Sequence, residues 1–153
     1  MRRRHRLVGS VAAVVGVAAL TACAGAAAVD SWLQGTWTCT SIVPYGSPVL
    51  ATVEVHDGTW SASIDGSRFD PDDPVTGAWS LSGGTLSVTP TEESEDLTGT
   101  IVGVPKNTDG LGTLAGVQWG EREGTTSVSA TIDSVSITRT DESEVTTTSC
   151  TKG

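Results

Sequence analysis

The chain has 153 residues and a formal net charge of −9 at pH 7, from 18 acidic and 9 basic residues. Four of the basic residues are arginines among the first six positions, so the rest of the chain carries five basic residues and a net charge of −13. This acidity argues against nucleic-acid binding and against docking on anionic headgroups, because both attract clusters of Lys and Arg. The length fits one domain with a single core.

Residues 1–22 have the three parts of a secretory signal peptide: a basic start, an apolar stretch from Leu7 to Leu20, and small residues at the end. The stretch is shorter than the roughly 20 apolar residues of a membrane-spanning helix, and it contains Gly9 and Gly16. We therefore expect residues 1–22 to direct export and to be removed.

The segment Leu20-Thr21-Ala22-Cys23 resembles the lipobox of bacterial lipoproteins. The resemblance implies a diacylglycerol thioether on Cys23, cleavage before it, and a protein anchored on the extracytoplasmic face of the cell membrane. Two acyl chains anchor a protein stably, whereas one gives only marginal binding. The alternative is an ordinary signal peptide that is cut at a later alanine, which would discard Cys23. The composition of leader and domain is typical of a high-GC actinobacterial product.

Residues 23–31 are predicted to form a short tether of small residues, followed by one domain over residues 32–153. A flexible tether of this length reaches only about 15 Å. The domain is therefore expected to lie close to the membrane.

Cys39 and Cys150 are the two cysteines left for pairing in an oxidising compartment. A disulfide between them would tie the first strand of the domain to the last. It would remove roughly 4–5 kcal/mol of denatured-state freedom in the chain-entropy model. The alternative is two free buried thiols. An immunoglobulin-type sandwich is not indicated, since its bridge joins internal strands.

From Trp32 onward, apolar residues recur at every second position between closely spaced turn signals, which predicts an antiparallel all-β domain without an amphipathic helix. The pairs Asp57-Gly58 and Gly83-Gly84 predict hairpin turns, because such turns need positive φ. Strands are expected at 34–43, 49–55, 60–64, 75–81, 86–88, 97–104, 111–119, 125–132, 134–140 and 144–151. A meander of about eight to ten strands closes most simply into a barrel, which removes exposed edges. A two-sheet β-sandwich is the alternative.

Leu33-Gln34-Gly35-Thr36-Trp37 resembles the Gly-x-Trp start of the first strand in lipocalin-like and other calycin barrels, and residues 76–88 are similar to a hairpin of bacterial lipocalin-like domains. The resemblance implies a calycin-like barrel in which Trp37 is a structural plug at the closed end. It also makes Arg139, on a late strand, the candidate to stack on Trp37. The chain lacks the Thr-Asp-Tyr motif of strict lipocalins and the biotin-binding motifs of avidin-like barrels.

Trp60, Trp79 and Trp119 lie at strand positions whose neighbours on the same face are small or aliphatic. If these faces point inward, the rings either fill the barrel or line a cavity that the small residues leave open. The second interpretation predicts a ligand site for an apolar molecule of the cell envelope.

Catalytic and metal-binding patterns are weak in this chain. His56 is the only histidine after the leader and lies on the polar side of a strand, and neither a Gly-x-Ser-x-Gly nor a Ser-x-x-Lys motif is present. Asp70, Asp72 and Asp73 match no calcium-binding loop and predict a solvated loop. We expect no enzyme activity, no metal and no cofactor. Paired carboxylates of a glycosidase remain an open alternative, because their separation is spatial.

Together these features predict a lipid-anchored envelope protein that binds a hydrophobic small molecule inside a β-barrel. The alternative is a non-enzymatic interaction module of the envelope with a filled barrel. In that case the outer face, or the loops over residues 65–75, 89–97 and 105–110, would contact another protein.

Overall fold

The computed structural model describes residues 27–65, 70, 72–92, 97–114, 116–120 and 124–153. The predicted signal peptide of residues 1–22 and the predicted lipidation site Cys23 lie outside the described residues.

The fold is all-β with very little helix, as the alternating sequence pattern predicts. The helical elements are α1 (Val29–Leu33) and the short 3-10 helix η2 (Thr108–Gly110). The strands are β1 (Gly35–Ile42), β2 (Val49–His56), β3 (Thr59–Asp65), β4 (Val75–Ser82), β5 (Thr85–Pro90), β6 (Gly99–Val102), β7 (Thr113–Leu114), β8 (Val117–Trp119), β9 (Thr125–Ala130), β10 (Ser134–Asp141) and β11 (Glu144–Lys152). In the described part of the chain, no helix has the length and apolar character that a membrane crossing requires.

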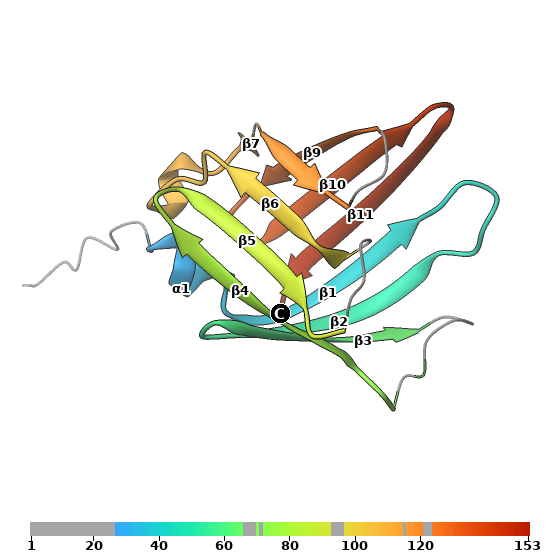
Figure 1. Ribbon diagram of the computed structural model, residues 1–153, viewed down its shortest axis with the longest axis horizontal. Helices are drawn as coiled ribbons and strands as arrows, with labels where there is room; N and C mark the ends of the chain where they lie inside the picture. Colours follow the sequence, from blue (N-terminus) through green and yellow to red (C-terminus); the bar gives the residue numbers. More distant parts are fainter. Residues whose placement is uncertain (1–26, 66–69, 71, 93–96, 115, 121–123) are drawn as a thin grey trace, which may run out of the picture.

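All eleven strands belong to one antiparallel sheet with the order β7-β9-β10-β11-β1-β2-β3-β4-β5-β6-β8. The sheet curls into a nearly closed barrel, in which the first strand pairs with the last (Figure 1). One seam is unsealed: β8 and β9 lie side by side, but no ladder joins them among the described residues. The predicted antiparallel barrel is confirmed, and the sandwich alternative is not.

The strand predicted over residues 111–119 is divided in the structure. Its first part is β7, which pairs with β9, and its second part is β8, which pairs with β6. Gly116, which precedes β8, has a φ of +68°, so the backbone leaves the extended conformation there. Consecutive segments of the chain thereby reach the two sides of the seam, and the division brings the number of strands in the described residues to eleven.

Both predicted hairpin turns are present. Gly58 lies between β2 and β3 with a φ of +71°, and Gly83 and Gly84 join β4 to β5 with φ values of +58° and +77°. Only glycine adopts this backbone region without steric cost, which explains why the turns occur at these positions.

The helix α1 covers one end of the barrel, which we call the closed end (Figure 1). Residues 29–31, which the sequence assigned to the tether, lie in this helix, and Val29 is only 1% exposed. Ala28 forms a β-bridge with Asn107, and the Val29 amide donates to the carbonyl of Lys106 at 3.0 Å. Five residues are too few for a stable isolated helix, so these tertiary contacts maintain α1. The opposite end carries the β1–β2 loop and the β10–β11 hairpin, and we call it the far end.

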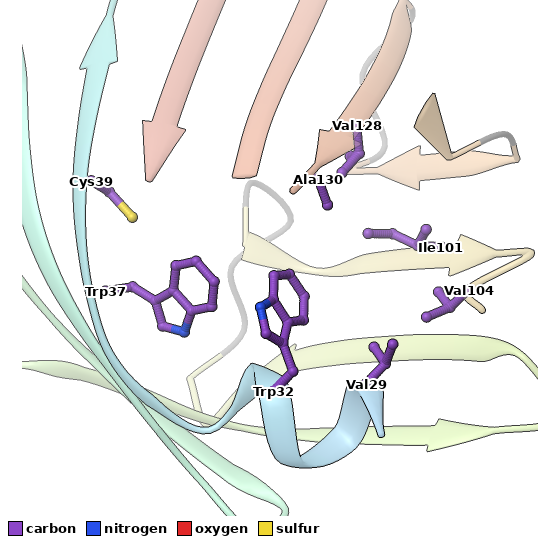
Figure 2. Close-up of a cluster of buried hydrophobic side chains, with 8 residues drawn as sticks. All are labelled: Val29, Trp32, Trp37, Cys39, Ile101, Val104, Val128 and Ala130. Atoms are coloured by element: carbon purple, nitrogen blue, oxygen red, sulfur yellow. The ribbon is translucent and has the colours of Figure 1, made fainter. Parts of the chain in front are cut away.

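The main hydrophobic cluster lies beside α1. It joins the helix to β1, β6 and β9 and contains Val29, Trp32, Trp37, Cys39, Ile101, Val104, Val128 and Ala130 (Figure 2). The core is therefore concentrated at the closed end.

Candidate functional site

The ladders identify the inner face of the barrel. Trp37 and Cys39 of β1 belong to the buried cluster, and they lie opposite Val53 and Ala51 of β2. Directly paired residues project on the same side of a sheet. The inner face can therefore be followed from strand to strand, for example from Val53 to Ala62 on β3.

Most of the inner wall is aliphatic and only half-buried. The half-buried inner residues are Val49, Ala51, Val53, Val55, Ile64, Val75, Leu81, Leu86, Val88, Val117, Val135 and Ile137. If neighbouring side chains filled the barrel at native density, these residues would be fully buried. Eight of them, from Ala51 to Ile137, also pack against the buried cluster, whereas Val49, Ile64, Val75 and Val88 do not. The apolar wall thus stays partly exposed.

Trp37 lies at the closed end, as the resemblance to calycin barrels implies. Its ring meets that of Trp32 edge to face, with centroids 5.2 Å apart and planes at 80° (Figure 2). Both indole nitrogens are hydrogen-bonded, from Trp37 to the Leu33 carbonyl at 2.9 Å and from Trp32 to the Ile132 carbonyl at 2.7 Å. These bonds fix the Trp32 ring of α1 and the neighbouring Trp37 ring at the closed end.

The cation beside Trp37 belongs to Lys152 and not to Arg139. Lys152 is the β11 partner of Trp37, and its Nζ lies 5.1 Å from the Trp37 ring centroid and 5.8 Å from that of Trp32. It also donates to the carbonyls of Gln34, at 2.8 Å, and Trp32. Burial lowers the pKa of the Lys152 ammonium below its ordinary value of 10.5.

Arg139 lies far from Trp37. It is paired with Thr146 of β11, six residues before Lys152, which corresponds to about 20 Å along the strand. The expectation that Arg139 stacks on Trp37 is therefore wrong. The reason is register: the ladder between β1 and β11 places Lys152, two residues after Cys150, opposite Trp37.

The predicted disulfide between Cys39 and Cys150 is present. The two residues are directly opposite each other in the β1–β11 ladder. The bond therefore links the first and last strands inside the wall, over a sequence separation of 111 residues.

Two of the candidate ligand-binding tryptophans cover glycines on the facing strand. Trp60 is buried opposite Gly77, where a Cβ would come within 2.5 Å of the indole ring. Trp119 is opposite Gly99, where a Cβ would overlap its six-membered ring. The glycines thus provide the space in which these rings lie against the wall.

Trp79 is half-buried, and its indole nitrogen donates to the His56 carbonyl at 2.6 Å. Its ladder partner is Val88, which in turn is opposite Gly99, the glycine that Trp119 covers. Trp79 and Trp119 are thus three strands apart on one row, or about 14 Å. With Trp60 they form what we call the aromatic wall, on the inner face of β3 to β8.

Across the barrel from the aromatic wall, the inner face is polar. We call this the hydroxyl wall and define it by Arg139 with Ser41, Thr126, Thr146 and Thr148. The Ser41 and Thr148 hydroxyls are hydrogen-bonded at 2.7 Å. Sequence reasoning considered Arg139 only as a partner for Trp37. The sequence pattern that could have identified Arg139 as an interior residue is a charge at the inward position of an alternating strand, after Val135 and Ile137.

The acidic residues and His56 lie elsewhere. His56 is 71% exposed and its Nε2 is 3.9 Å from a Glu54 oxygen. The side chain of Asp70 accepts the amide of Asp72 at 3.0 Å, which closes a local turn at the surface. Among the residues that the structure describes, no group of three or more His, Cys, Asp or Glu side chains is arranged to hold a metal ion.

Comparison with protein-family models, with curated proteins and with solved structures found no match to this chain. The fold is consistent with a calycin-like domain, a conclusion that rests on the eleven-stranded antiparallel barrel itself.

Proposed function

We propose that this chain is a lipid-anchored protein of the cell envelope whose β-barrel binds a hydrophobic small molecule. The observation that carries the proposal is the inner wall: its side chains are aliphatic and stay partly exposed, although most of them also pack against the buried cluster. Apolar surface that stays accessible inside a protein is favourable to cover with a ligand.

The aromatic wall supports the same function. Trp60 is buried against Gly77, whereas Trp79 and Trp119 are half-buried, so the last two rings leave part of their apolar surface exposed. Such surfaces contact an apolar or aromatic ligand over a large area. We propose these three tryptophans as its lining and Trp37 as the closed-end plug.

The position of α1 relates the barrel to the proposed anchor. The described chain enters the barrel at the closed end, and Val29 is buried there. Cys23 is six residues before Val29, which is at most about 20 Å of extended chain. An acylated Cys23 would hold the closed end near the membrane on the extracytoplasmic side, and a ligand would enter from the far end.

The proposed role is binding, without catalysis and without a metal or cofactor. It is tested by native mass spectrometry of the full chain extracted from its own membrane. A reproducible added mass that denaturation releases supports the proposal and gives the ligand class. The same spectra report the lipid on Cys23. A lipidated chain that carries no other mass contradicts the binding function but not the anchoring.

A second candidate, an envelope protein-interaction module, is favoured by a different observation. Ile42 is 60% exposed, Leu50 49% and Val145 51%, and all three lie on the outer face of adjacent strands near the far end. Tyr45 in the neighbouring β1–β2 loop is fully exposed. Of the two surfaces expected from the sequence, this one is the outer face and not the loops over residues 65–75, 89–97 and 105–110. A photo-cross-linking residue at Ile42 should then capture one defined envelope protein in cells, whereas the same residue at the exposed polar position Thr52 should not.

A further inference from the structure

Arg139 faces the interior of the barrel from β10. It follows Val135 and Ile137 at alternating positions, and both of these pack against the buried cluster. Its ladder partners are Thr126 on β9 and Thr146 on β11, so both neighbours in its row carry hydroxyl groups. It lies three residues before the β10–β11 hairpin, in the half of the barrel nearer the far end.

One hydrogen-bond donor of the Arg139 guanidinium has no partner. Its Nη2 is shielded from solvent and has no hydrogen-bond partner. In the described part of the chain the ion pair is that of Glu54 with His56, and no carboxylate reaches Arg139. A charged donor that is buried without a partner destabilises a fold, and native structures rarely contain one without a functional reason.

The surroundings of Arg139 suit an anion. The other members of the hydroxyl wall are Ser or Thr, whose hydroxyls donate hydrogen bonds without adding negative charge. The next inward pair toward the hairpin, Asp141 with Glu144, carries carboxylates, but among the described residues neither forms an ion pair with Arg139. Arginine presents a planar fork of N–H groups that matches a carboxylate or a phosphate. The aliphatic and aromatic surfaces lie on other strands of the same interior. One ligand with a charged head group and an apolar body would pair with the Arg139 guanidinium and cover the apolar surfaces.

We propose that the ligand of this barrel is an amphipathic anion, whose oxyanion head group, a carboxylate or a phosphate, is bound by Arg139 while its apolar part lies against the aromatic wall. This inference rests on the proposed function, since it specifies the ligand of the same interior. Arg139 is then a binding residue that is retained for recognition at a cost in stability.

The test compares eight-carbon ligands that differ only in the head group. Octanoate, octyl phosphate and 1-octanol are titrated calorimetrically into the full chain in phosphatidylcholine nanodiscs, with empty nanodiscs as the blank. We expect at least one anion to bind about tenfold or more tightly than the alcohol. The better of the two anions identifies the head group.

Three variants assign that preference to Arg139. Arg139→Met should remove the preference for the anion without weakening octanol binding, and Arg139→Lys should keep part of it, because the charge remains but the fork is lost. Lys106→Met, at an exposed position, is the control for a change in net charge and should alter nothing. Arg139→Met should also unfold at the same or a higher temperature than the native chain, since it removes an unpaired buried donor.

The outcomes separate the two proposals. If all three compounds bind equally to the native chain, or if Arg139→Met keeps the preference for the anion, the anion inference is wrong and the binding barrel stands. If none of the three binds, the binding function fails and the inference fails with it. If Arg139→Met does not fold, Arg139→Lys and the preference of the native chain decide.

Discussion

Lys152 lies directly opposite Trp37 in the ladder between the last strand and the first, and its Nζ lies 5.1 Å from the Trp37 ring centroid. The same ammonium donates to carbonyls of Trp32 and Gln34 around the C-terminal end of α1. One side chain at the C-terminus thereby joins β11, β1 and the helix that covers the closed end.

We expect Lys152→Met to lower the free energy of unfolding by about 1–3 kcal/mol, because it removes charge-assisted hydrogen bonds and cation–π contacts while retaining most of the apolar stem. Urea denaturation of both proteins measures the difference. Lys106→Met is the matched control and should change the free energy by less than about 0.5 kcal/mol. An equal effect of the two substitutions would show that the contacts of Lys152 contribute nothing specific.

The same lysine predicts a dependence of stability on pH. Its pKa is lowered by burial in the folded protein, so between that pKa and 10.5 the unfolded chain binds more protons than the folded one. The free energy of unfolding, relative to that of Lys152→Met, should therefore rise with pH across this window. Urea titrations of both proteins from pH 8 to 10.5 test this. A difference that is constant or falls with pH would contradict desolvation as the dominant effect.

The contacts of Trp60 with Gly77 and of Trp119 with Gly99 predict that neither glycine tolerates a side chain. Gly77→Ala and Gly99→Ala should each lower the free energy of unfolding by about 1–3 kcal/mol, because the Cβ overlaps the Thr89 carbonyl oxygen and the Trp60 ring at Gly77, and the Trp119 ring at Gly99. Gly112→Ala is the control, since a Cβ there meets no atom within 4 Å.

The glycine prediction has an internal check. Trp119→Leu should reduce the penalty of Gly99→Ala in the double variant, because the smaller side chain leaves room for the Cβ, whose close contacts are all with the Trp119 ring. If the two losses of unfolding free energy simply add in the double variant, the contact between the Cβ and the indole ring is not their cause.

The disulfide closes nearly the whole domain, with a sequence separation of 111 between its cysteines. Replacing Cys39 and Cys150 together by alanine should lower the free energy of unfolding by about 2–5 kcal/mol, because the unfolded chain gains freedom. Urea denaturation followed by circular dichroism measures this loss. Folded ellipticity without denaturant should persist, since the β1–β11 ladder remains. An unchanged midpoint would mean that the bond does not restrict the unfolded chain.

The accessible interior can be tested without knowledge of the ligand. Ile64 is half-buried on the inner face of β3, outside the residues that pack against the buried cluster, and next to the exposed outer residue Ser63. Ile64→Phe should cost less than about 1 kcal/mol in the free energy of unfolding, because the larger ring enters accessible space; a filled barrel would instead impose about 1–3 kcal/mol of overpacking. Ser63→Phe controls for the effect of adding a ring to this strand. Thermal unfolding of both variants distinguishes the two cases.

Local backbone chemistry made several features predictable from the sequence. Alternating apolar residues indicated strands, and Gly58, Gly83 and Gly84 marked hairpins, because these patterns act over a few neighbouring residues. Two cysteines in the presumed first and last strands indicated the disulfide and, with it, the closure of the barrel. The antiparallel all-β barrel was accordingly within reach of the sequence.

The features that sequence reasoning missed depend on contacts between distant segments. The helix α1 exists because Val29 is buried and Trp32 is bonded to Ile132, and no local pattern of five residues reports this. The division of residues 111–119 depends on which edge strand each half meets. Both features are decided by tertiary pairing, which stabilises them only once the sheet has formed.

In the candidate site, too, some features follow from local sequence patterns and others from tertiary contacts. The sequence by itself determined that Trp60, Trp79, Trp119 and Arg139 lie on strands, and alternation indicated which of their neighbours share a face. Only the tertiary structure decided that Lys152 and not Arg139 meets Trp37, and that the Nη2 atom of Arg139 is shielded from solvent without a hydrogen-bond partner. The physical reason is register: one residue of shift between paired strands moves a side chain to the other face, and register is set by the whole barrel.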